Sequence, residues 1–144
     1  MTGTAPLSLH ASCVAWQGRG VLITGPSGSG KSALALELMA YGCDLVADDR
    51  TLVYVGADGG LRATCPAAIA GLIEARGVGL LEARPTGPAA PCLAVALDRP
   101  ETERLPPKRC VTYLGCSLPL LHNIGTGHFA PAILQYLKAG RREP

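Results

Sequence analysis

Eight consecutive residues near the N-terminus have the types and spacing of a phosphate-binding loop. They are Gly25, Pro26, Ser27, Gly28, Ser29, Gly30, Lys31 and Ser32. The three glycines allow a tight turn in which the backbone N–H groups converge on one anion. The lysine can reach the outer phosphates of a nucleoside triphosphate, and the serine hydroxyl can bind Mg²⁺. The loop therefore predicts nucleotide binding but not the reaction, and a glycine-rich turn that only caps a helix is the alternative.

Two adjacent carboxylates, Asp48 and Asp49, directly follow the apolar run 45–47. A carboxylate at the end of a buried strand can hold Mg²⁺, or it can accept the proton of an attacking hydroxyl. Beside a metal, the pair could divide these roles, with one group ionised and the other raised in pKa. The alternative is an acidic pair in a solvated turn.

Three further residues could belong to the same site. Glu74 and Arg76 are two positions apart before the glycine-bearing segment 77–79, so in an extended chain they lie on one side. Glu74 could bind Mg²⁺ and Arg76 could bind phosphate, whereas a surface ion pair is the simpler interpretation. His10 precedes the first predicted strand and, taken alone, is typical of polar surface.

A phosphate-binding loop of this kind needs a strand before it and a helix after it, and the sequence predicts both. Residues 21–24 form a short β-branched run that ends at Gly25, and residues 12–16 are its predicted antiparallel partner across a glycine-bearing turn. From residue 32 to 41 the apolar spacing changes to that of a helix, with Gly42 suited to its end. The loop is thereby placed between a buried strand and a helix.

The rest of the chain reads as short strands and loops, closed by a helix. Further strands are predicted at 44–47, 51–55, 61–65, 92–97, 111–113 and 118–121, and a terminal helix at 130–139. Pro66 could open a helical turn towards Ile73. Residues 84–91 and 98–108 read as irregular surface loops. These elements predict one α/β domain built on a mixed β-sheet.

The bulk composition limits the classes of function. At 144 residues the length fits about one domain, and the net charge of +2 (13 Lys and Arg against 11 Asp and Glu) argues against nucleic-acid or membrane partners. We find neither a long apolar run nor a secretory signal, so a cytoplasmic location is expected. The six cysteines are scattered without a Cys-x-x-Cys pair, which favours small buried side chains over a zinc site or disulfides.

In chain order, His10, the phosphate-binding loop, the acidic pair and the segment starting at Glu74 resemble the catalytic domain of HPr kinase/phosphorylase. The stretch 72–81, Leu-Ile-Glu-Ala-Arg-Gly-Val-Gly-Leu-Leu, is close to that family's signature, and Leu-Val-Ala-Asp-Asp at 45–49 is equally typical. The resemblance is strong over residues 7–81 and weaker beyond. It implies an α/β fold consisting of a single P-loop domain, with a mixed β-sheet flanked by helices.

The family uses ATP and Mg²⁺ to phosphorylate a serine of HPr, the small phosphocarrier of the sugar phosphotransferase system. Many members also run the reverse reaction, in which phosphate attacks the phosphoserine. The resemblance therefore implies that this chain is a protein-serine kinase acting on an HPr-like phosphocarrier. Residues 25–32 would bind ATP, with Lys31 polarising the transferring phosphoryl group and with Ser32 and Glu74 as the Mg²⁺ ligands.

The resemblance also assigns residues on the acceptor side of the reaction. Asp49 would be the base that takes the serine proton, and Asp48 would support it. His10 would lie near the phosphates, and Arg104 matches the family's later catalytic arginine.

Three features depart from the family. Residues 1–144 read as the kinase domain alone, a short form without the N-terminal domain of full-length members. Ala33 replaces the usual glutamate after the loop serine, and the region 121–128 lacks the arginine of the family's C-terminal segment. We therefore expect kinase activity more than phosphorylase activity. Because full-length members are hexamers, a homo-oligomer is also expected.

Two other functions stay open at this stage. A non-catalytic nucleotide-sensing regulator would bind ATP and change a partner interface, which the short chain and the altered region 121–128 allow. A small-molecule P-loop kinase would need a dedicated acceptor pocket and usually a mobile lid, for which 144 residues leave little room.

Overall fold

The structure, a computed structural model, describes residues 5–125 and 127–142, so Thr126 of the region 121–128 lies outside the described residues. The strands are β1 Leu7–Leu9, β2 Ala11–Trp16, β3 Arg19–Thr24, β4 Asp44–Ala47, β5 Thr51–Val55, β6 Leu61–Thr64, β7 Leu72–Ala75, β8 Gly79–Glu82, β9 Ala90–Pro100, β10 Cys110–Tyr113 and β11 Cys116–Asn123. The helices are α1 Lys31–Ala40 and α2 Phe129–Ala139, with a 3₁₀ turn, η1, at Ala67–Ile69.

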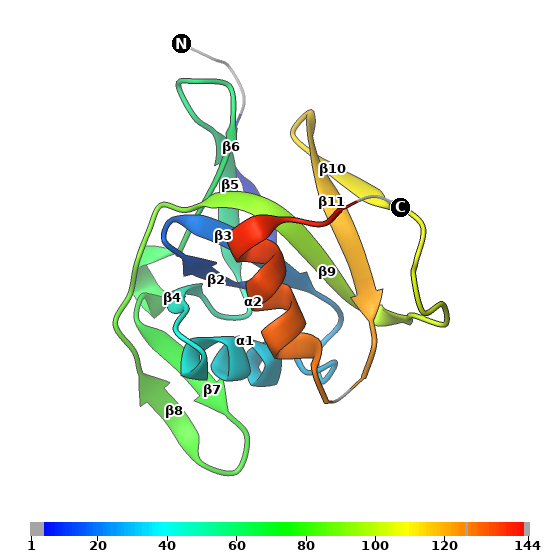
Figure 1. The fold of residues 1–144 in the computed structure, drawn as a ribbon. Coiled ribbons are helices and arrows are strands. Elements are labelled where there is room, and N and C mark those ends of the chain that lie inside the picture. Colours follow the sequence, from blue (N-terminus) through cyan, green and yellow to red (C-terminus); the bar gives the residue numbers. More distant parts are fainter. Residues whose placement is uncertain (1–4, 126, 143–144) are drawn as a thin grey trace.

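A mixed six-stranded sheet forms the centre of the α/β fold, in the order β10-β11-β9-β3-β2-β4 (Figure 1). Strand β9 runs parallel to both β3 and β11, whereas β2 is antiparallel to both β3 and β4. Because β2 lies between β3 and β4, those two strands point the same way. Their C-terminal ends therefore meet the start of β2 at one edge of the sheet.

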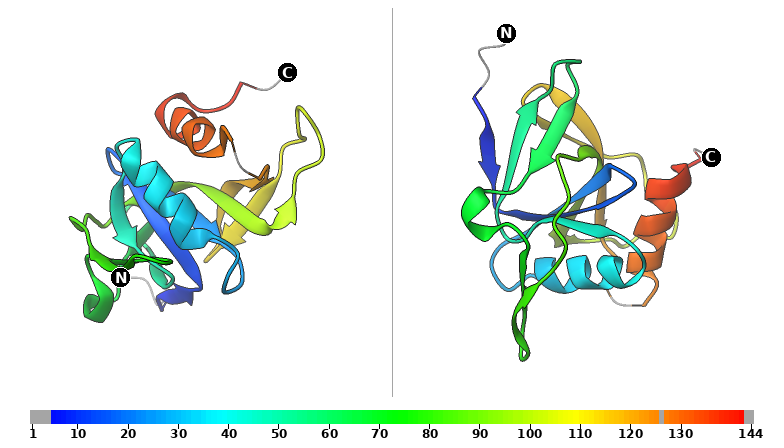
Figure 2. Two further views of the ribbon diagram at one scale, coloured as in Figure 1. Left: turned by 90° about the horizontal axis from the view of Figure 1, so that it is seen from below. Right: turned by 90° about the vertical axis from the view of Figure 1, so that its left-hand side faces the viewer.

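The two faces of this sheet are covered differently. Helices α1 and α2 pack together on one face, and the small sheet β1-β5-β6 covers the other (Figure 2). The helix face buries Val14, Val21, Ile23 and Val95, and the opposite face buries Cys13, Ala15, Leu22 and Ala94. This alternation is that of strands buried on both sides, which explains why they are apolar throughout.

Most of the predicted elements are confirmed. The pair 12–16 and 21–24, the helix after the loop, the strand 44–47 and the terminal helix all appear within one or two residues of their predicted bounds. The hairpin of 51–55 with the following strand is confirmed as β5–β6.

Two expectations about the connections are confirmed only in part. The helical turn expected after Pro66 forms as η1 but ends at Ile69, and Ile73 lies in β7 of the antiparallel hairpin β7–β8. Strand β9 continues through residues 98–100, which were expected to lie in a surface loop, because Pro100 pairs with Asn123 of β11. In both places pairing with a partner strand overrides the local turn signal.

The six cysteines are free thiols that differ in burial. Cys13 and Cys43 are buried, and Cys110 is exposed. Burial raises the pKa of the Cys13 thiol, and it raises the pKa of Cys43 to about 11. Only these two match the expected small buried side chains fully. In the described part of the chain, neither helix is long and apolar enough to cross a membrane.

Candidate active site

The glycine-rich loop, residues 25–30, joins the end of β3 to the start of α1. Gly25, Gly28 and Gly30 have φ values of +151°, +84° and +100°, which L side chains rarely adopt. A Cβ placed on Gly25 would lie 2.5 Å from Ser29 Oγ, so the loop closes on itself only with glycine there. A Cβ on Gly28 or Gly30 would meet nothing within 4 Å. The outer side of the loop is therefore open.

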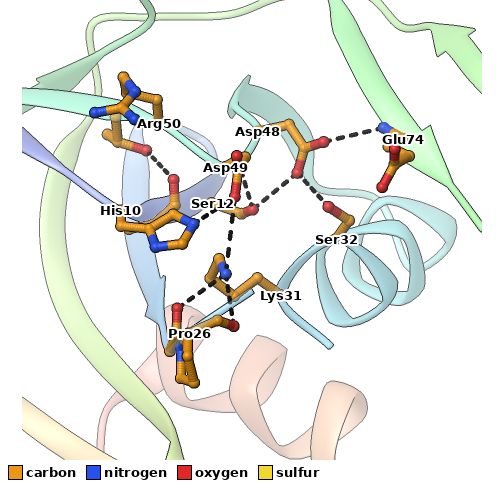
Figure 3. Close-up of polar contacts among 12 residues, drawn as sticks. His10, Ser12, Pro26, Lys31, Ser32, Asp48, Asp49, Arg50 and Glu74 are labelled. Carbon is orange, nitrogen blue, oxygen red and sulfur yellow. Dashed lines mark hydrogen bonds and ion pairs between the residues drawn. The ribbon is translucent and has the colours of Figure 1, made fainter. Parts of the chain in front are cut away.

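Lys31 is held at the mouth of this loop. Its side chain is only 5% exposed, and its Nζ donates hydrogen bonds to the carbonyl oxygens of Gly25 (2.9 Å) and Pro26 (3.1 Å). The same Nζ lies 3.8 Å from Asp49 Oδ1. The lysine thus links the loop to the acidic pair (Figure 3).

Asp48 is a buried centre of hydrogen bonds, with 8% exposure. Its Oδ1 accepts from the hydroxyls of Ser12 (2.8 Å) and Ser32 (2.6 Å), and its Oδ2 accepts from the Glu74 backbone N–H (3.0 Å). Three donors offset the cost of removing this carboxylate from water. The side chain therefore fastens β2, α1 and β7 to the end of β4.

Asp49 has a contrasting environment, because its side chain is 61% exposed. Its Oδ1 lies 2.8 Å from His10 Nε2, and its backbone N–H donates to Ser12 Oγ at 3.0 Å. The residue has φ +65°, a left-handed conformation that aspartate tolerates better than most residues. Its neighbour Asp48 points inwards, so one carboxylate of the pair is buried and the other is exposed (Figure 3).

A cavity of about 310 Å³ opens beside the acidic pair. It is lined by Asp48, Asp49, Arg50, Pro66, Ile69, Leu72 and Leu80. The apolar part of the lining comes from the segment around η1 and from the β7–β8 hairpin. The cavity therefore borders the exposed carboxylate with an apolar wall.

The structure brings together most of the residues singled out from the sequence. Lys31, Ser32, Asp48 and Asp49 form one network with His10, joined through Ser12. In the described residues, no group of three or more histidine, cysteine, aspartate or glutamate side chains converges as a metal site.

The other three predicted residues lie differently. Glu74 joins the network through its backbone N–H, and its side chain is exposed. Arg76 is exposed in the turn between β7 and β8, and Arg104 is exposed in the loop between β9 and β10. In the part of the chain that the structure describes, neither arginine is bonded to the network.

Sequence reasoning missed Ser12, which is fully buried in β2 and bonds to both acidic residues. It also missed the cavity, whose walls are far apart in the sequence. The available signal for Ser12 was weak: one polar residue in an apolar strand, two positions after His10.

Comparison with known proteins agrees with this geometry. The model of the HPr serine kinase C-terminal domain family matches residues 4–86. HPr kinase/phosphorylase of Limosilactobacillus reuteri is 48% identical over 75 residues, which cover 52% of this chain and 23% of the relative. The protein of the same name from Bordetella pertussis is 52% identical over 67 residues, covering 46% of this chain and 22% of the relative. The matches thus span less than a quarter of these curated relatives.

The solved structure of the HPr(Ser) kinase/phosphatase from Coxiella burnetii is also similar, with a TM-score of 0.74 and 25% identity. The similarity covers 92% of this chain and 88% of that one. The family model spans more than half of the sequence, and it includes the glycine-rich loop and the acidic pair. This chain belongs to the HPr serine kinase C-terminal domain family.

Proposed function

We propose that the chain is a protein-serine kinase that transfers the terminal phosphoryl group of ATP to a serine of an HPr-like phosphocarrier. The observation that carries this proposal is the 3.8 Å approach of Lys31 Nζ to Asp49 Oδ1 at the mouth of the glycine-rich loop. A cation for the phosphoryl donor and a base for the acceptor hydroxyl thereby lie side by side. Positioning of this kind supplies most of the rate gain in phosphoryl transfer.

The residues of the loop fit a nucleoside triphosphate. The space beside Gly28 and Gly30 is open, and the absence of a Cβ at these positions leaves room for phosphate groups. The first N–H groups of α1 lack intrahelical acceptors and add their partial positive charge at the same point. Ser29 Oγ is buried without a hydrogen-bond partner among the described residues, so this loop has a further polar atom that a bound phosphate could satisfy. Residues 25–32 are therefore the proposed ATP-binding residues.

Ser32 also fits a role in holding Mg²⁺. Its hydroxyl hydrogen is directed to Asp48, which leaves the oxygen lone pairs for a metal. Mg²⁺ in such sites binds few protein ligands besides phosphate oxygens and water, and when bound it neutralises charge on the phosphates. Ser32 and the Glu74 carboxylate are the proposed ligands, and Asp48 orients Ser32. Arg76 stays a prediction as a phosphate ligand. A catalytic role for Arg104 rests on the family resemblance alone, because its side chain is exposed in the loop after β9 and is not bonded to the network in the described residues.

On the acceptor side, Asp49 takes the proton of the serine hydroxyl while the serine oxygen bonds to the γ-phosphorus and the bond to the β-phosphate oxygen breaks. His10 orients the carboxylate through its Nε2. The cavity beside Asp49 gives space for the residues that flank the serine, and its apolar wall suits a protein acceptor. Assembly into a homo-oligomer and the reverse phosphorylase reaction stay predictions.

Incubation with ATP, Mg²⁺ and an HPr-like protein, followed by mass spectrometry of the carrier, tests the proposal. We expect phosphoserine on the carrier, formed at least about a hundredfold more slowly by Asp49→Asn but at the wild-type rate by the matched control Asp58→Asn, whose carboxylate lies in the exposed turn before β6. Full transfer by Asp49→Asn would show that the assigned base is wrong. ATP binding without transfer to any carrier would instead favour the nucleotide-sensing alternative.

A further inference from the structure

Ser12 is an unusual residue for its place in the fold. It lies in β2, opposite Ile23 of β3, and its side chain is fully buried. Buried hydroxyls need partners, and in a strand this apolar an alanine would be the simpler choice. The reason for a serine here must therefore lie in what its hydroxyl binds.

That hydroxyl connects the two acidic residues. Ser12 Oγ donates its single hydrogen to Asp48 Oδ1 at 2.8 Å, which leaves its lone pairs to accept the Asp49 backbone N–H at 3.0 Å. One oxygen atom thus joins the side chain of the first aspartate to the main chain of the second (Figure 3).

The two aspartates depend on this hydroxyl to different degrees. Asp48 has two other donors, the Ser32 hydroxyl and the Glu74 backbone N–H. Asp49 has its backbone in the left-handed region at φ +65°, and the Ser12 bond fixes its N–H there. Loss of the hydroxyl therefore releases Asp49 while Asp48 keeps most of its support.

We propose that Ser12 is a positioning residue that holds Asp49 in the left-handed conformation from which its carboxylate meets His10 and Lys31. This inference rests on the proposed function, in which Asp49 is the base. Ser12 has no contact with the phosphates or the acceptor in this scheme. It acts on the transfer step through Asp49, and its bond to Asp48 is one of three that this carboxylate accepts. Small displacements of a catalytic group lower the rate of transfer without weakening nucleotide binding.

The experiment compares Ser12→Ala with Thr51→Val. Thr51 is an equally buried hydroxyl two residues after Asp49, and it donates to the Ala11 carbonyl at 2.8 Å without contacting either aspartate. Three quantities are measured for each variant: the exchange rate of the Asp49 amide by NMR, the Kd for the Mg-nucleotide, and kcat for transfer to the carrier. The transfer measurement is repeated in an Asp49→Asn background.

For Ser12→Ala we expect faster exchange of the Asp49 amide, a kcat lower by about tenfold, and a nucleotide Kd changed by less than about twofold. Thr51→Val leaves all three near the wild-type values. In the Asp49→Asn background Ser12→Ala has no further effect, since residues that act as a unit are not additive. Should Ser12→Ala unfold, Ser12→Cys, with its weaker acceptor sulfur, is expected to show a smaller loss of the same kind.

Two results would overturn the proposal. One is that Ser12→Ala has the same Asp49 amide exchange rate and the same kcat as Thr51→Val. The other is an equal loss of kcat with and without the Asp49 carboxylate, because the effect would then be a general one on the fold. If the wild-type protein transfers no phosphate, the proposed function fails, while the amide exchange still decides whether Ser12 holds Asp49.

Discussion

The two parts of this chain contribute differently to the molecule. Residues up to 86 supply the glycine-rich loop, the acidic pair and Ser12, and the family model ends at that position. Residues 87–142 supply β9 at the centre of the sheet and the apolar face of α2. The similarity to the Coxiella burnetii structure extends over 92% of the chain, so the fold continues where the family model stops.

The first part thus contains the residues of the candidate site, and the second part holds the elements around them in place. Strand β9 pairs in parallel with the whole of β3, and α2 buries Ile133 and Leu137 in the same core as Leu38 of α1. The second part therefore fixes the strand and helix on either side of the loop. Apolar packing tolerates many substitutions at constant volume, whereas a hydrogen-bond network needs particular atoms.

The largest expected effect is in the first part of the chain. Lys31→Ala removes the cation at the mouth of the loop, and transfer is expected to fall by about a thousandfold, as when a single charge-stabilising donor is lost from an active site. The fold should persist, because the variant leaves the apolar core intact. Transfer is measured with the HPr-like carrier, and the Kd for the Mg-nucleotide is measured by calorimetry.

The matched control is Lys138→Ala in α2, whose ammonium lies over the Trp16 ring. We expect it to leave transfer unchanged. A similar loss of transfer in both variants would show that the two parts do not differ in their contribution to the reaction.

Support from the second part can be tested in α2. Ile133→Ala leaves a cavity in the core and should lower the free energy of unfolding by about 2–5 kcal/mol, measured by urea denaturation. Gln135→Ala, on the exposed face of the same helix, should change it by less than about 0.5 kcal/mol. Under conditions where Ile133→Ala stays folded, its nucleotide Kd should match the wild type. A weakened Kd there would mean that α2 also shapes the loop.

The cavity beside Asp49 gives a finer test within the first part. Leu80→Ser should raise the KM for the protein acceptor by about tenfold, because binding loses the burial of one leucine side chain. The nucleotide Kd should not change. Val78→Ser serves as control, because Val78 is exposed on the same hairpin but does not line the cavity. Equal effects of both variants would point to the hairpin as a whole.

The smallest effect is expected at Arg104. Its side chain is exposed in the loop after β9, and such residues contribute little unless they contact the site. Arg104→Ala should lower transfer by less than about threefold in the carrier assay. A loss comparable to that of Lys31→Ala would place this loop in the reaction and assign chemistry to the second part as well.

Local patterns were enough to predict the loop, the strand before it, the helix after it and the acidic pair. Each of these is encoded by neighbouring residues, as in the β-branched run 21–24 that ends at Gly25. The alternation at 74–76 was also informative, since Glu74 and Arg76 are exposed while Ala75 is buried.

Other features depend on contacts between distant residues. Ser12 reaches Asp48 only because β2 lies between β3 and β4, an order that no local pattern reveals. The β7–β8 hairpin was missed because Pro66 favours a helical turn towards Ile73, and because, within the described residues, each strand pairs only with the other. The cavity combines residues from both of these unpredicted arrangements.

The two hydrogen bonds from Lys31 to the carbonyl oxygens of Gly25 and Pro26 have a consequence for ligand entry. An anion that binds this ammonium competes with the two carbonyl oxygens and with Asp49 for its three N–H donors, so loading the loop is at least in part an exchange of partners. Its free energy is the difference between two sets of hydrogen bonds. That difference grows with the number and charge of the oxygens that the incoming group brings, so the resting loop discriminates against anions with a single weak charge.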